Sequence, residues 1–113
     1  MAVTKLTTEA PEEGTYSIIV GFTDEDGDAM SPTTLSWSLV NMFGNVINER
    51  ELVSIDAPSS SETIVLYGDD LALSGIDRRR RLTLIGTYDS TYGSDLPLTA
   101  ECEFRISQFI GVE

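Results

Sequence analysis

Hydrophobic and polar residues alternate in short blocks along this chain, and turn-rich segments separate the blocks at intervals of roughly 8–12 residues. In residues 15–23 the even-numbered positions are aromatic or branched, and in residues 34–41 Leu35, Trp37 and Leu39 alternate with smaller side chains. A period of two is that of a strand with one buried face, because successive side chains point to opposite faces of a sheet. We therefore expect both segments to be strands.

Further blocks predict the remaining strands. Residues 46–55 follow the turn signal Gly44-Asn45, and the charges in their middle are typical of an edge strand. Residues 62–67, 79–89 and 98–107 alternate as well, most regularly in the last block, where Cys102 falls on the apolar face. A weak first strand is expected within residues 3–8, although residues 1–13 could instead be frayed.

The connecting segments fall into two groups, because successive strands run in opposite directions. One end should gather the loops 24–32, 56–61 and 90–97, and the other end the segments 9–14, 42–45 and 68–78. Residues 68–77 break the alternation, and we expect a single helical turn near residues 69–74. Leu71 and Leu73 should then pack beneath the strands.

About seven strands in 113 residues predict one all-β domain covering residues 1–113. The strand count and Trp37 on the third strand favour an Ig-like or fibronectin-type β-sandwich of antiparallel strands. Cys102 is the only cysteine, so the inter-sheet disulfide of antibody domains cannot form. On an inward face, this thiol is expected to be an inert core residue.

Charge and composition narrow the function. Nineteen acidic and seven basic residues give a net charge of −12, which disfavours binding to nucleic acids and to anionic membranes. No run approaches the roughly 18 apolar residues of a membrane span, and the first residues do not resemble a secretory signal. The chain has no histidine and no glycine-rich phosphate loop, so we expect a non-enzyme with no catalytic residue and no cofactor.

The stretch "DEDGD" resembles a calcium loop, with Asp24, Asp26 and Asp28 at the first, third and fifth positions. An EF-hand needs glycine at the sixth position and glutamate at the twelfth, where this chain has Ala29 and Leu35. An EF-hand is therefore excluded. Two interpretations stay open: a solvated acidic turn, or a looser calcium site completed by Asp89 or Asp95 from the neighbouring loop.

The same end carries two tyrosines in "TYDSTYGSDLP". Tyrosine beside serine and glycine is the composition of a recognition loop, because it combines rigid amphipathic area with adaptable hydrogen bonds. The alternative is packing, with Tyr88 at the edge of the core and Tyr92 over the loop. We retain Tyr92 as a candidate binding residue.

The opposite end carries four of the seven basic residues in one run: Arg78, Arg79, Arg80 and Arg81. Such a cluster can bind an acidic partner surface, or it can neutralise nearby carboxylates such as Asp69, Asp70, Asp77 and Glu12. The neighbouring turn can expose Met42 and Phe43, and exposed apolar residues beside arginines are typical of interfaces. We therefore include these six residues as candidates for partner binding.

Several stretches together carry a family resemblance: the "DEDGDAMSPT" turn before "LSWSLVN", then "FGNVIN", "IVLYGDDLAL" and "RRLTLIGTYDSTYGSDLPLTAECEFRI". Over residues 14–112 the chain resembles small acidic Ig-like proteins encoded in the structural-gene regions of tailed bacteriophages and prophages. The resemblance implies an accessory or structural protein of the virion, assembled in the host cytoplasm, that binds capsid, tail or other virion proteins. A bacterial extracellular Ig-like module that binds carbohydrate or a cell-surface protein is the alternative.

Overall fold

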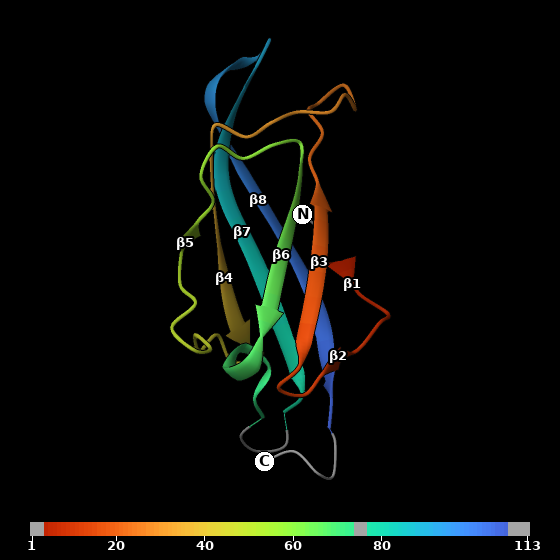
Figure 1. The fold of residues 1–113 in the computed structure, drawn as a ribbon. Helices are drawn as coiled ribbons and strands as arrows, with labels where there is room; N and C mark the ends of the chain where they lie inside the picture. The colour runs from red at the N-terminus through yellow and green to blue at the C-terminus, as the bar shows by residue number, and fades with distance from the viewer. Residues whose placement is uncertain (1–3, 74–76, 109–113) are drawn as a thin grey trace.

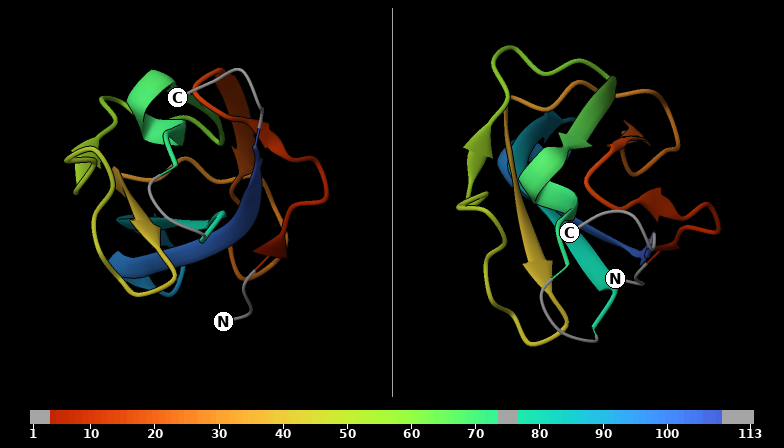
Figure 2. Two further views of the ribbon diagram at one scale, coloured as in Figure 1. Left: turned by 90° about the horizontal axis from the view of Figure 1, so that it is seen from below. Right: turned by 60° about the horizontal axis from the view of Figure 1, so that its bottom comes forward.

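The structure is a computed structural model that describes residues 4–73 and 77–108. The chain forms an elongated molecule of 52 × 24 × 23 Å, built from strands and one short 3-10 helix in its described part. Figure 1 shows the strands running along the long axis, and the views in Figure 2 show that they form two layers. The all-β prediction is therefore confirmed.

The smaller sheet pairs β3 (Thr15–Gly21) with β6 (Ser61–Tyr67). The even-numbered residues of both strands point inward, and Tyr16, Ile18, Ile64 and Leu66 are buried in the core. The odd-numbered residues face outward and are exposed. The strands predicted at residues 15–23 and 62–67 are thus present, and the first buries the face that its alternation predicted.

The larger sheet has the order β1-β8-β7-β4-β5, with β2 also paired to β8. Its long strands are β4 (Thr34–Asn41), β7 (Arg79–Ser90) and β8 (Gly93–Ser107), all antiparallel to their neighbours in this group. Trp37, Leu82, Leu84 and Phe104 face the smaller sheet and are at least nine-tenths buried, and the rings of Tyr16 and Phe104 lie 5.0 Å apart across the two layers. The core therefore lies between the two sheets.

The N-terminal prediction was wrong in detail. Instead of one antiparallel strand within residues 3–8, two short strands, β1 (Thr4–Lys5) and β2 (Ala10–Pro11), pair with β8 in the parallel direction. The larger sheet is therefore mixed. Both strands are too short to show an alternation, and the position of the segment is set by the β8 edge to which it binds.

Residues 46–55 do not form the predicted edge strand. Apart from an isolated bridge between Val46 and Val40, only β5 (Val53–Ser54) of this segment pairs with β4, and most residues between them form turns and bends. Asn48, Glu49 and Leu52 have φ angles of 53°, 58° and 49°, which a strand does not contain. The charged centre of this segment, Arg50, is instead directed toward the 3-10 helix at one end of the molecule.

The predicted loop at residues 90–97 is mostly strand, because β7 and β8 continue to a tight connection at residues 91–92. The backbone N–H of Ile106 donates to Arg78 of β7, so the even-numbered residues of β8 form the hydrogen-bonded pairs with β7. The backbone nitrogen of Pro97, an odd-numbered residue, therefore points away from β7, and proline fits there because no hydrogen bond is lost. The sequence did not predict this part of β8, because residues 93–97 contain glycine, proline and polar residues that are typical of a loop.

The helical turn is η1 (Gly68–Leu71), close to the predicted residues 69–74, of which residue 74 lies outside the described part. Leu71 is fully buried, and Leu73 packs against the core as expected. On β7, a side chain at Gly86 would meet the carbonyl oxygen of Thr34 at 2.2 Å, so only glycine permits the close approach of β4 at this position.

Candidate interaction surface at the arginine-rich end

A groove of about 410 Å³ lies at the end of the molecule where β7 begins and β8 ends (Figure 1). We call it the arginine groove, and its lining residues are Phe43, Asp77, Arg78, Arg79 and Arg105. They come from the turn after β4, the segment that leads into β7, and the last part of β8. The groove therefore brings together residues more than sixty positions apart in the sequence.

The sheet register places Arg79 of β7 directly opposite Arg105 of β8, and both side chains are exposed. Like charges that face each other on neighbouring strands destabilise a sheet. Asp77 offsets part of this repulsion, since its Oδ1 lies 3.7 Å from Nε of Arg79 and accepts the backbone N–H of the same residue. Within the described part of the chain, Arg78 and Arg105 make no ion pair. The groove thus has an excess of positive charge in a protein of net charge −12.

Phe43 is 80% exposed at the rim of this groove. The side chain of Asn41 fixes the turn that carries it, because Oδ1 accepts the backbone N–H groups of Phe43 and Asn45. Gly44 has a φ of 85°, a conformation that glycine adopts without strain. Met42 is only half-buried and does not line the groove. Phe43 is therefore exposed to solvent on a defined turn, as the sequence predicted, whereas the same prediction for Met42 was wrong because its side chain is half-buried.

The four consecutive arginines have different roles. Arg80 is buried, and its guanidinium donates hydrogen bonds to the carbonyl oxygens of Asp77, Arg79 and Ala72. Arg81 pairs with Glu101 at 3.0 Å and with Glu103 at 3.4 Å on the neighbouring strand. Only Arg78 and Arg79 line the groove, and Arg105 joins them. Arg105 was missing from the sequence-based candidates because its proximity to Arg79 depends on the register of the β7–β8 hairpin.

A second charged cluster, the Arg50–Asp70 network, lies between the turns after β4 and η1. Arg50 binds Asp70 through Nε at 2.7 Å and through a second nitrogen at 3.3 Å, while Asn48 and the backbone N–H of Tyr67 also donate to the Asp70 carboxylate. The Asp70 side chain is fully buried, and the Arg50 guanidinium lies 5.9 Å from the Trp37 ring centre and 5.8 Å from that of Tyr67. All of its polar contacts are internal, so this cluster is structural.

The Asp70 carboxylate stays charged inside this network. Burial by itself raises the pKa of Asp70, but the hydrogen bonds from Arg50, Asn48 and Tyr67 outweigh it and hold the pKa below its ordinary value. The sequence had suggested that Asp70 neutralises the arginines at positions 78–81. Its partner is Arg50 instead, whereas the expected pairing of Asp77 with that run is confirmed through Arg79.

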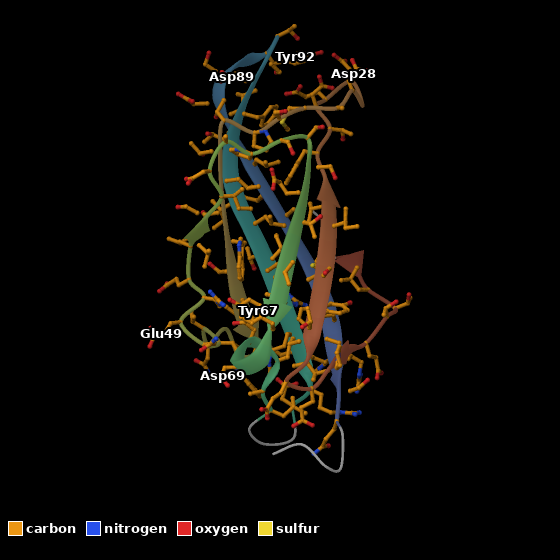
Figure 3. All side chains as sticks on the ribbon, viewed as in Figure 1. Asp28, Glu49, Tyr67, Asp69, Asp89 and Tyr92 are labelled. Carbon is orange, nitrogen blue, oxygen red and sulfur yellow. The ribbon has the colours of Figure 1, made fainter. Side chains whose placement is uncertain are left out.

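The opposite end of the molecule carries the acidic turns, and Figure 3 shows Asp28, Asp89 and Tyr92 there, far from Glu49 and Asp69. Asp24 organises its turn, because its Oδ1 accepts the backbone N–H groups of Asp26 and Asp28. No group of three or more His, Cys, Asp or Glu side chains in the described residues is placed to hold a metal ion. The calcium interpretation of Asp24, Asp26, Asp28 and Asp95 stays a prediction, which a calcium-dependent rise in melting temperature would support.

The two tyrosines at this end differ. The hydroxyl of Tyr88 donates to Oε2 of Glu25 at 2.6 Å, which lowers the pKa of Glu25 and raises that of Tyr88. Its ring packs against the core, in agreement with the packing interpretation. Tyr92 is 68% exposed in the β7–β8 connection. The exposed aromatic residues Phe43 and Tyr92 thus lie at opposite ends, one beside arginines and the other beside aspartates.

Cys102 is buried in β8, and burial raises the pKa of its thiol. A thiol of raised pKa holds little thiolate at neutral pH, so this residue is a poor nucleophile. It belongs to the core, as its position on the inward face predicted.

Neither a protein-family model, nor a curated protein, nor a solved structure matches this chain. In the described residues, no helix is long and apolar enough to span a membrane.

Proposed function

We propose that this chain is a non-enzymatic binding module that recognises a protein partner through the arginine groove. The observation that carries the proposal is the pairing of Arg79 with Arg105 beside an almost fully exposed Phe43. A sheet gains no stability from facing arginines, and a phenylalanine in water contributes little to folding. Both features would contribute to binding if a partner covered them, since aromatic residues and arginines supply much of the binding energy at interfaces.

The partner chemistry follows from the groove. Three guanidinium groups complement carboxylates, and Phe43 requires a small apolar pocket on the partner. The preferred partner surface is therefore a protein surface with clustered Asp or Glu side chains around an apolar depression. The net charge of −12 repels phosphates over most of the molecule, so we do not propose nucleic acid.

We further propose that the fold is an Ig-like β-sandwich. The distribution of strands supports this, with β3 and β6 in one sheet and β4, β7 and β8 in the other. The chain crosses between the sheets four times, after β2, β3, β5 and β6. The buried Trp37 on β4 is a second feature that Ig-like domains share. The two-stranded smaller sheet and the parallel N-terminal strands are departures from the common pattern.

The biological setting that we propose is the virion of a tailed bacteriophage or prophage, with a capsid, tail or other virion protein as the partner. The support for this setting is the sequence resemblance described above. A module that binds through one end of a rigid sandwich suits a particle-associated protein, because the strands hold the binding turns in fixed positions.

The test is co-sedimentation of the purified protein with capsids and with tails of the phage whose genes adjoin its own. We expect Phe43→Ala and Arg105→Glu each to weaken binding at least tenfold, because each removes one component of the groove. Tyr92→Ala is the matched control, since it removes another largely exposed aromatic residue from the other end. Loss of binding in Tyr92→Ala alone would contradict the proposed surface, and binding to a glycan array rather than to particles would favour the extracellular alternative.

A further inference from the structure

The smaller sheet has an edge that is open along β3. The backbone N–H of Phe22 donates to Ser60, and that of Gly68 donates to Gly14, so the even-numbered residues of β3 form the hydrogen-bonded pairs with β6. In an antiparallel ladder the alternate residues direct their N–H and C=O groups to the other side. Ser17, Ile19 and Gly21 therefore present their backbone groups at the outer edge. In the described residues, nothing pairs with these groups.

This edge lacks the devices that usually protect a free strand. Natural edge strands carry charges, proline or bulges that prevent pairing with another chain. The β3 sequence TYSIIVG has none of them, and its register with β6 runs without a shift. The outward face of the β3–β6 sheet is also uncharged, and its apolar members are clearly exposed: Ile19 at 73%, Val65 at 44% and Tyr67 at 56%.

An apolar cleft of about 180 Å³ lies beside the same edge, between β3 and the middle of β8. Most of its lining is apolar: Leu6, Ile18, Ile19, Val20, Leu84, Ala100 and Cys102. The lining also includes the charged residue Glu101, whose carboxylate already binds Arg81 and Thr83. A cavity of about 150 Å³ with such a lining accommodates a benzene-sized group, so this cleft accommodates one apolar side chain. In Figure 1, β1 lies beside the middle of β3 on the side away from β6, and no strand lies beside the end of β3 that leads to the acidic turn. Residues 6–8 line a second cleft together with Tyr16–Ile19.

The occupant that fits these features is an extended segment of a different protein. Each successive side chain of a strand added to β3 would point alternately into the cleft and outward beside Ile19. The segment should be uncharged with β-branched residues in its centre, because neither the β3 edge nor the outward face offers a charged partner. Its end beside the Asp24–Asp28 turn should be basic, since three aspartates follow β3 there. A second copy of this chain is disfavoured, because each copy carries a net charge of −12.

We propose that residues 19–21 of β3 and the adjoining cleft form a second binding site, which accepts a basic-ended extended segment of a partner protein as an additional strand. The site lies on a different part of the molecule from the arginine groove, and it binds mainly through backbone hydrogen bonds. It therefore does not depend on the function proposed for that groove.

The experiment is amide hydrogen exchange followed by NMR on the full chain, with the peptide acetyl-KKTVTVT-amide as the probe. Antiparallel addition places the two lysines of this peptide beside the aspartate turn. We expect saturating peptide to slow exchange of the Ile19 and Gly21 amides at least tenfold. Thr63 and Val65 are internal controls, because their amides face the other free edge of the same sheet. The peptide acetyl-EETVTVT-amide should bind at least tenfold more weakly.

Two proline variants complete the test. Ile19→Pro removes an edge N–H that takes no part in the β3–β6 ladder, and it should abolish the protection of Gly21. Thr63→Pro makes the same change on the β6 edge and should leave the protection intact. The proposal is overturned if saturating peptide slows neither amide, if it protects Thr63 and Val65 equally, or if protection arises without peptide as the protein concentration rises. The peptide comparison in the unmodified protein keeps the proposal testable should Ile19→Pro fail to fold.

Discussion

The Arg50–Asp70 network and the arginine groove occupy the same end of the molecule, yet they hold guanidinium groups in opposite ways. In the network Arg50 lies within 6 Å of two aromatic ring centres and binds a fully buried carboxylate that also accepts hydrogen bonds from Asn48 and Tyr67. In the groove Arg79 and Arg105 face each other in water with one weak ion pair to Asp77. A buried charge whose hydrogen bonds are all made stabilises the fold, whereas exposed like charges contribute nothing to it, which is why we propose that a partner covers the groove.

The largest expected effect concerns the network. Asp70→Ala should lower the free energy of unfolding by about 3 kcal/mol, because it leaves Arg50 without its anion and the Tyr67 N–H without an acceptor. Urea denaturation measures the change. The neighbouring Asp69→Ala is the matched control and should change stability by less than about 0.5 kcal/mol, since Asp69 is exposed. Equal effects of the two substitutions would contradict a stabilising role of the network.

Substitution of Arg80 tests whether a buried arginine stabilises the fold more than an arginine that lines the groove. Arg80→Ala should cost about 2 kcal/mol, because three backbone carbonyl oxygens lose their donor and a cavity forms beneath β7. Arg78→Ala, one residue of the same type two positions earlier, should cost less than about 0.5 kcal/mol. Differential scanning calorimetry gives both values, and a larger loss for Arg78→Ala would contradict this division.

The pH dependence of stability should show a smaller effect of the same network. The folded-state pKa of Asp70 lies below its unfolded value of about 3.9, so the folded protein binds the proton less readily than the unfolded chain. The stability that this group supplies is fully present above about pH 5 and is lost as the pH falls through the folded pKa. The difference in urea midpoint between the native protein and Asp70→Asn should therefore be constant from pH 7 to 5 and shrink below pH 4. A difference that grows in acid would contradict the network.

The smallest effect has the opposite sign. Arg105→Thr should raise the free energy of unfolding by about 0.3 kcal/mol, because it removes the repulsion with Arg79 on the facing strand. Arg81→Thr makes the same exchange where the arginine has two glutamate partners, and it should lower stability by about 0.5 kcal/mol. Chemical denaturation at low ionic strength resolves the pair, and a loss of stability in Arg105→Thr would indicate a structural role for that residue.

The candidate surface illustrates the limits of pattern analysis. Phe43 and the arginine run were visible in the sequence, because a turn signal and a cluster of like charges are local features. The sequence did not predict which arginines are free to contact a partner. Arg80 is buried, and Arg81 forms ion pairs with two glutamates of β8. Arg105 enters the groove only through the register of the β7–β8 ladder, and register is a property of the assembled sheet.

The sequence by itself determined the strands with one buried face. The period-two alternation in β3, β4 and the second half of β8 predicted both their existence and their inward residues, because burial of one face requires that pattern wherever the strand lies in the fold. The position of η1 and the core location of Leu71 and Cys102 follow from the same local signal.

Only the tertiary structure decided what happens where that signal is weak. Residues 46–55 leave the strand conformation because Arg50 finds Asp70 twenty residues further along the chain. The N-terminal segment pairs in the parallel direction with β8, and the edge of β3 consequently stays open. A contact between residues distant in sequence produces no periodic pattern in the chain. It depends on how the two sheets pack, and that packing depends on all the core residues together.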